Sequence, residues 1–212
     1  MGSIKLPHAS GNSVSIAAPQ SNPGSDRTLY LPSDADGTIA RTSDRVLQKI
    51  STTTVSSAVA QIDLSIDSTT YKSVWIFVEG LQTDADCNMY ARFAVAGTYN
   101  TNANYSSMTV KKHAGGFDSS TYGGGGQTYA YLTNNIGGAS GESWSAQIRM
   151  NLGTEVGYPL MSIETAYKDN SGGLAGNFVS IFYENWSIIN GIRLYPSTGN
   201  IDAGKITLYG IT

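Results

Sequence analysis

The sequence contains very little of the chemistry on which metal sites and disulfides depend, since 212 residues include one cysteine and two histidines. A single cysteine, Cys87, excludes an intramolecular disulfide and a zinc site built from several cysteines. His8 and His113 are far apart in the chain, and isolated histidines of this kind are usually structural or solvated. We therefore expect no metal, no other cofactor and no catalytic histidine.

Charge is also scarce. Asp, Glu, Lys and Arg make up 14% of the chain, with a net charge of −3, whereas about 25% is typical of soluble domains. This balance offers no basic surface for nucleic acid. The longest apolar run, residues 74–78, is too short for a membrane helix, which needs about 20 residues. The N-terminus lacks the apolar core of a signal peptide, so we expect assembly in a cytoplasm.

Small polar and aromatic residues take the place of the missing charge. The chain has 26 Ser, 20 Thr, 14 Asn, 13 Tyr and 24 Gly. Thr and Tyr favour the pleated surface of a sheet, whereas Ser, Asn and Gly favour turns. This composition predicts an all-β protein and argues against a helical enzyme.

From residue 51 onward, apolar and polar residues alternate in short segments that turn residues separate. The clearest alternation covers residues 144–152, and residues 40–50 are the one weak helix candidate. Further strands are expected at residues 58–66, 73–78, 89–95, 160–167, 177–183, 186–195 and 205–211. Eight or nine strands predict an antiparallel, jelly-roll-like β-sandwich over residues 51–212, preceded by an extended, β-rich N-terminal anchoring segment.

The N-terminal segment, residues 1–50, holds four of the six prolines and only short β signals between turns. Such short signals cannot close a core of their own. We expect this segment to contact another chain or another protein, and a loosely held arm is the alternative. The apolar residues predicted to make the contact are Ile4, Leu6, Val14, Ile16, Leu29 and Leu31.

One segment, residues 114–126, holds six glycines in thirteen residues, which predicts a long loop or a tight interface turn. Long loops on β-sandwiches often carry binding sites. Tyr122, Tyr129 and Tyr131 lie in or next to this segment, and tyrosine offers an apolar ring and a polar tip to a sugar. These three residues are the candidate ligand contacts. The alternative is that they pack at a subunit interface or cover a sheet.

Enzyme signatures are weak. Residues 123–126 are not followed by the Lys-Ser/Thr of a phosphate-binding loop, and Gly138-Ala-Ser-Gly141 has the wrong spacing for a serine nucleophile. A glycosidase needs only two carboxylates across a groove, and we expect Glu164 on a solvated strand face. We predict a non-enzymatic protein. The carboxylates that keep a glycan-degrading enzyme as an alternative are Glu142, Glu155, Glu164 and Glu184.

Two Asp-rich turns resemble calcium ligands. Residues 34–37 look like the start of an EF-hand loop, but Arg45 stands where that loop needs a glutamate. Asp84, Asp86 and Asn88 alternate and could hold Ca²⁺, or they could form a hydrogen-bonded turn between two strands. The turn is the favoured interpretation.

Several short motifs resemble proteins of tailed-bacteriophage particles. Residues 189–211, with Gly199-Asn-Ile201 and the final Leu208-Tyr-Gly210, resemble the closing strands of small phage appendage proteins. Residues 71–81 and Tyr90-Ala-Arg-Phe93 are similar to the same β-sandwich group. Residues 10–16, 26–32 and 36–38 resemble short attachment repeats of phage tail-fibre and structural proteins.

The resemblance implies a virion structural protein of the tail-fibre or head-decoration type, commonly trimeric and without catalytic residues. We therefore expect a homotrimer that residues 1–50 attach to other virion proteins of the tail or capsid. Residues 51–212 would form a head that binds a host-surface glycan. A capsid cement protein is the first alternative and a glycan-degrading depolymerase the second.

Overall fold

The computed structural model describes residues 3–7, 13–17, 47–113, 116–118, 125–153 and 157–212. The chain divides into two compact units, Met1–Asp44 and Arg45–Thr212. The described part of the first unit is an antiparallel pair of strands, β1 (Ser3–Pro7) and β2 (Ser13–Ala17). Ile4 pairs with Ile16 and Leu6 with Val14. Leu29 and Leu31 lie outside the described residues.

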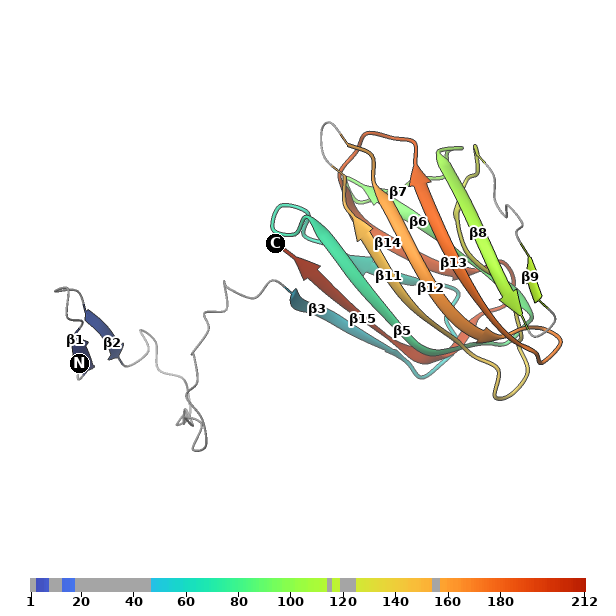
Figure 1. Ribbon diagram of the computed structural model, residues 1–212, viewed down its shortest axis with the longest axis horizontal. Coiled ribbons are helices and arrows are strands. Elements are labelled where there is room, and N and C mark those ends of the chain that lie inside the picture. The colour runs from blue at the N-terminus through green and yellow to red at the C-terminus, as the bar shows by residue number, and fades with distance from the viewer. Residues whose placement is uncertain (1–2, 8–12, 18–46, 114–115, 119–124, 154–156) are drawn as a thin grey trace. The chain divides into compact units, whose positions relative to one another are not determined.

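The second unit consists of two antiparallel sheets (Figure 1). The larger has eight strands, in the order β3 (Leu47–Val55), β15 (Ile201–Ile211), β5 (Ser73–Thr83), β11 (Trp144–Asn151), β12 (Leu160–Lys168), β13 (Leu174–Tyr183), β8 (Tyr105–His113) and β9 (Gly116–Asp118). The smaller has five strands, in the order β10 (Ala130–Ile136), β6 (Cys87–Val95), β14 (Ile189–Pro196) and β4 (Ile62–Ser65), with β7 (Thr98–Tyr99) pairing with β6.

A single hydrophobic core lies between the two sheets. Ile76 and Ile148 enter it from the larger sheet, and Phe93 and Leu194 enter it from the smaller one. Alternate residues of most strands point inward, which is the pattern of a two-sheet sandwich. The predicted all-β antiparallel β-sandwich is therefore confirmed. Within the described ranges, no helix has the length and apolar character needed to cross a membrane.

The described residues contain more strands than the eight or nine predicted for the head. β8 was not among the predicted strands, and its hydropathy is inverted: Ser107, Thr109 and Lys111 are buried, whereas Met108 and Val110 face outward. In β10, every residue but Asn135 is buried, so the strand shows no alternation.

The helix suggested for residues 40–50 is wrong for the residues that the structure describes, because residues 47–50 belong to strand β3. This strand pairs with β15, with Leu47 opposite Ile211. The hydrogen bonds of the sheet decide its structure, because tertiary pairing overrides weak local helix propensity.

The inward position of Ile148, on β11 near the middle of the larger sheet, gives a test of the strand register. Ile148 is 1% exposed and its neighbour Gln147 faces outward. We expect Ile148→Ala to lower the free energy of unfolding by about 2–5 kcal/mol, because it leaves a cavity in the core. Gln147→Ala, the matched control, changes it by less than about 0.5 kcal/mol. Urea denaturation measures both, and equal effects would contradict the register.

Candidate functional site

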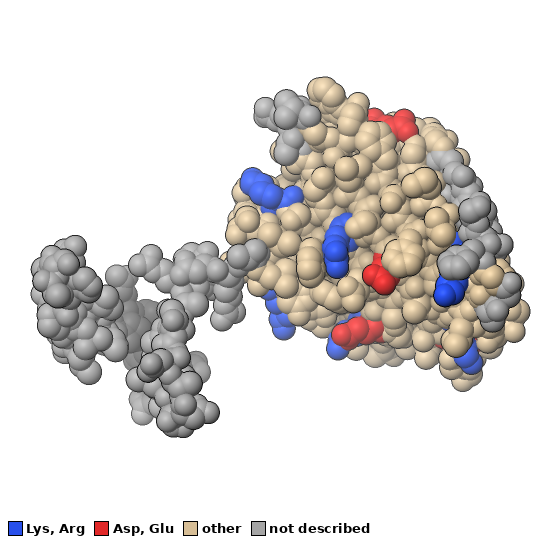
Figure 2. Space-filling view, viewed as in Figure 1, with Lys and Arg blue, Asp and Glu red and all other residues tan. Residues whose placement is uncertain are grey.

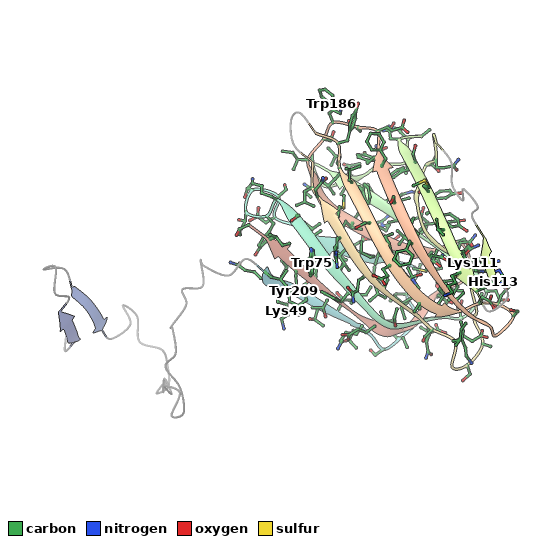
Figure 3. The ribbon with its side chains drawn as sticks, viewed as in Figure 1. Lys49, Trp75, Lys111, His113, Trp186 and Tyr209 are labelled. Atoms are coloured by element: carbon green, nitrogen blue, oxygen red, sulfur yellow. The ribbon has the colours of Figure 1, made fainter. Side chains whose placement is uncertain are left out.

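The outer face of the eight-stranded sheet carries the side chains of these strands that do not enter the core. It lies toward the viewer in Figure 2, where charged side chains are scattered over an otherwise uncharged face. Strand register fixes which of its side chains are neighbours. Tyr209 lies opposite both Lys49 and Trp75, and Arg149 lies opposite both Trp75 and Ser162. Figure 3 shows Lys49, Tyr209 and Trp75 close together at one side of this face.

Three aromatic rings pack on each other in this row. The ring of Phe77 meets that of Tyr209 edge to face, with centroids 5.7 Å apart, and lies 6.3 Å from the ring of Trp75. The guanidinium carbon of Arg149 lies 4.8 Å from the centroid of Trp75. A cation–π contact at an exposed site contributes about 0.5–1 kcal/mol. These contacts orient the rings, which remain half-buried rather than covered.

Shallow hollows run across the sheet beside these rings. One of about 410 Å³ is lined by Trp75, Arg149 and Ser162, and another of about 430 Å³ by Phe77, Gln147 and Glu164. A smaller hollow of about 190 Å³ shares residues with both. We call this surface the polar–aromatic groove and define it by Trp75, Phe77, Gln147, Arg149, Ser162 and Glu164.

The groove combines ring faces with hydrogen-bonding groups. Gln147, Arg149, Ser162 and Glu164 are exposed, so their donors and acceptors are open to solvent or to a ligand. Arg149 supplies donors only, ionised Glu164 acceptors only, and Gln147 and Ser162 supply both. The arrangement can bind a molecule that has both apolar surface and many hydroxyl groups.

A second aromatic group, the tyrosine cluster, lies on the outer face of the five-stranded sheet. Tyr90 stacks on Tyr129 with centroids 4.1 Å apart, and it lies 5.6 Å from Tyr131 and 5.7 Å from Tyr195. Arg92 lies over the ring of Tyr195 at 5.1 Å and donates from Nε to the Thr128 carbonyl at 3.3 Å. Burial raises the pKa of both Tyr129 and Tyr195.

The structure brings two of the three predicted ligand contacts together in this cluster. Tyr131 is 7% exposed and Tyr129 is half-buried against Tyr90, so both rings cover the sheet as well as each other. Tyr122 and most of the glycine-rich segment lie outside the described residues. Sequence reasoning missed Tyr90 and Tyr195, because only strand register places them beside Tyr129.

Sequence reasoning also missed the polar–aromatic groove. Its residues are spread over β5, β11 and β12, and no local motif connects them. The available signal was the outward phase of each strand: the alternation at residues 144–152 places Gln147 and Arg149 on the solvated side. The same reasoning correctly placed Glu164 on a solvated face.

The Asp-rich turn at residues 84–88 connects loops of the sandwich. Asp84 accepts hydrogen bonds from the backbone and side-chain nitrogens of Asn200, at 2.7 and 2.9 Å. Asp86 accepts one from Gly138 N at 2.9 Å, and Asn88 Oδ1 accepts one from Asn135 N at 2.9 Å. The three side chains thus reach three different partners. Among the described residues, no group of three or more His, Cys, Asp or Glu is placed to hold a metal.

The other candidate carboxylates are dispersed. Glu142 accepts a hydrogen bond from Ala139 N at 2.9 Å, and Glu184 accepts one from the hydroxyl of Ser106. Glu164 shares a hollow with Glu79, which forms an ion pair with Lys205. His8, Glu155 and residues 34–37 lie outside the described residues.

Comparisons with known proteins add no relationship: no protein-family model matches the chain, and no curated protein matches it.

The contact between Asp84 and Asn200 leads us to predict how the stability of the fold depends on pH. Hydrogen bonds from Asn200 hold the pKa of Asp84 below its ordinary value of 3.8. A depressed folded-state pKa stabilises the fold at neutral pH, and this contribution is lost as pH falls through the folded-state pKa. We therefore expect Asp84→Asn to lower the melting temperature at pH 7, with a difference from wild type that shrinks in acid below pH 3.8.

Thr198→Ala, in the same exposed turn as Asn200, is the matched control, and its difference from wild type should not vary with pH. Melting curves followed by circular dichroism measure both variants. An Asp84→Asn difference that stays constant from pH 7 into acid would show that the carboxylate charge does not stabilise this turn.

Proposed function

We propose that the protein is a non-enzymatic structural protein of a tailed-bacteriophage virion, and that its β-sandwich binds a host-surface glycan. The observation that carries the glycan proposal is the polar–aromatic groove. There, the half-buried ring of Trp75 lies beside exposed donors and acceptors on neighbouring strands. The place in a virion is supported by the resemblance of its sequence motifs to phage appendage proteins.

A sugar ring fits the chemistry of this groove. Its C–H face is apolar and packs on an aromatic ring, whereas its hydroxyls need several donors and acceptors at the edge. Arg149 can donate two parallel hydrogen bonds, and Glu164 can accept hydroxyl protons. Because the hollows follow one another across the strands, the groove suits an oligosaccharide better than a single sugar.

The groove is favoured over the tyrosine cluster because its polar side chains are more available. In the cluster, Tyr90 and Tyr129 stack face to face, and Arg92 already contacts Tyr195 and the Thr128 carbonyl. A ligand there would have to displace existing contacts. In the groove, a ligand would share the Trp75 ring with Arg149 but reach the exposed side chains of Gln147 and Glu164 directly.

The segment that precedes β3, residues 1–46 of the predicted anchoring segment 1–50, is proposed to attach the protein to other virion proteins. An isolated two-stranded hairpin such as β1–β2 is at best marginally stable in water. A partner surface would supply the missing burial, with Ile4, Leu6, Val14 and Ile16 as its contacts. The proposed assembly is a homotrimer, for which the low charge of the chain is suitable, since interface cores are depleted of charge.

A capsid cement protein is the nearest alternative, since the same head could clamp capsid subunits. A depolymerase is supported by one observation, the presence of Glu79 and Glu164 in a single hollow. A glycosidase needs a protonated carboxyl as general acid. Glu79 is already engaged in an ion pair with Lys205. Binding without hydrolysis is therefore the better-supported function.

The glycan proposal is tested with the purified full chain on an array of bacterial surface polysaccharides. We expect wild type to bind, and Trp75→Ala to weaken binding about tenfold or more, as loss of a central aromatic contact does. Tyr129→Ala, in the tyrosine cluster, is the matched control and should bind as wild type does. Loss of binding in Tyr129→Ala with normal binding in Trp75→Ala would move the site to the cluster.

Two further readouts separate the alternatives. Release of reducing sugar from a bound polysaccharide, abolished by Glu164→Gln, would establish a depolymerase. Virus particles that lack the protein should adsorb poorly to their host if it binds a receptor. Particles that adsorb normally but break on heating would establish a cement protein instead.

A further inference from the structure

An apolar strip lies beside the groove on the outer face of the eight-stranded sheet, over β12, β13 and β8. Its members are strongly exposed for apolar side chains: Leu174 72%, Phe178 64%, Met108 61%, Leu160 49% and Val110 42%. All five are on the outward phase of their strands. We call these five residues the apolar strip.

The strip is continuous. Phe178 lies directly opposite Val110, and Met108 is opposite Ser180, one outward position further along the same two strands. Leu160 and Met108 line one hollow of about 400 Å³, and Leu174 and Phe178 line another of about 410 Å³. Neighbouring exposed apolar residues that share hollows form a surface rather than isolated exceptions.

The inverted hydropathy of β8 makes this surface unusual. The strand turns Thr109 and Lys111 toward the core and Met108 and Val110 toward solvent. Burial in the sandwich therefore does not account for the apolar residues of β8. A second surface that covers the outer face would account for them.

The size of the strip fits a protein interface. Five apolar side chains with exposures of 42–72% form a patch on the scale of the largest one on a typical monomer, about 300–600 Å². A standard interface buries about 800 Å² per partner, roughly 56–65% of it apolar, so the strip can supply its apolar part.

The occupant must itself be apolar. Met, Val, Leu and Phe side chains offer no hydrogen bonds to a sugar, whose hydroxyls would lose water without replacement. The strip therefore differs in chemistry from the groove beside it.

The borders of the strip carry both signs of charge. Glu164 lies opposite Phe178 and Lys168 lies opposite Leu174 on the β12 side, and Lys112 lies opposite Gly176 on the β8 side. A border of mixed sign does not repel a second copy of this chain, and the apolar area of the strip is what a contact between copies needs.

We propose that copies of this chain associate through the apolar strip, with Phe178 near the symmetry axis. The number of copies, three, rests on the proposed function. The contact surface is inferred from the exposed apolar residues of the strip alone. This contact leaves Trp75, on β5, outside the strip, beside the interface.

Light scattering coupled to size exclusion tests the proposal on the full chain. Wild type should have about three times the monomer mass of 22.4 kDa. Phe178→Asp should be a folded monomer, with association weakened about a hundredfold or more, because it places a charge in an apolar interface. Trp186→Asp is the matched control, since Trp186 is 57% exposed and outside the strip, and it should remain assembled.

A second position of the strip gives an independent readout that does not depend on the Phe178 variant. Leu174→Asp should also weaken association, because Leu174 is the most exposed of the five residues. A wild type that is monomeric at all concentrations, or an assembly that Phe178→Asp leaves intact, would overturn the proposal. A dimer that Phe178→Asp dissociates would support the surface and contradict only the trimer of the proposed function.

Discussion

The fold depends on one constraint: successive side chains of a strand point to opposite faces, and the core of this sandwich can accept only one of them. In the eight-stranded sheet, the five-stranded sheet covers the inner face, so Ile76, Ile148 and their neighbours are buried between the two. The side chains of the outer face do not have to pack into this core. The composition of that face reflects other requirements, and it carries aromatic and polar residues over β5 and β11 and exposed apolar residues over β13 and β8.

The part of the core beside β13 and β8 contains buried polar residues, although the outer face of these strands carries exposed apolar ones. Asn177 donates from Nδ2 to the hydroxyl of Thr133 at 2.9 Å, and Asn177 N donates to the hydroxyl of Thr165 at 3.1 Å. Lys111 is buried, and its Nζ lies 3.8 Å from Oδ2 of Asp169. Buried polar groups are tolerated when they are hydrogen-bonded, and such networks specify a unique arrangement of strands. The same strands present Phe178 and Val110 to the outside. β8 therefore carries mainly polar residues inward, whereas Asn177 lies among apolar inward residues of β13.

The alternation at residues 144–152 was enough to predict β11, its inward residues and the all-β class, because burial and periodicity agree there. The same pattern did not identify the inward residues of two other strands. In β8 the buried side chains include Thr109 and Lys111, and in β10 nearly every residue is buried, so apolar and polar residues do not alternate. The groove and the tyrosine cluster could not be predicted as sites. Trp75 meets Arg149, and Tyr90 meets Tyr129, only through strand pairing between segments far apart in the chain. The same holds for Asp84, whose role depends on Asn200 from another turn.

The outer face of the larger sheet is proposed to serve binding, with its apolar part covered by other copies. Hydroxyl-radical footprinting of the full chain, read by mass spectrometry, tests this arrangement. Met108 and Trp186 are both strongly exposed in the single chain, at 61% and 57%. We expect Met108 and Phe178 to be protected at concentrations where the chain associates and to become reactive on dilution, whereas Trp186 reacts throughout. Reaction of Met108 and Phe178 at the rate of open side chains under all conditions would contradict it.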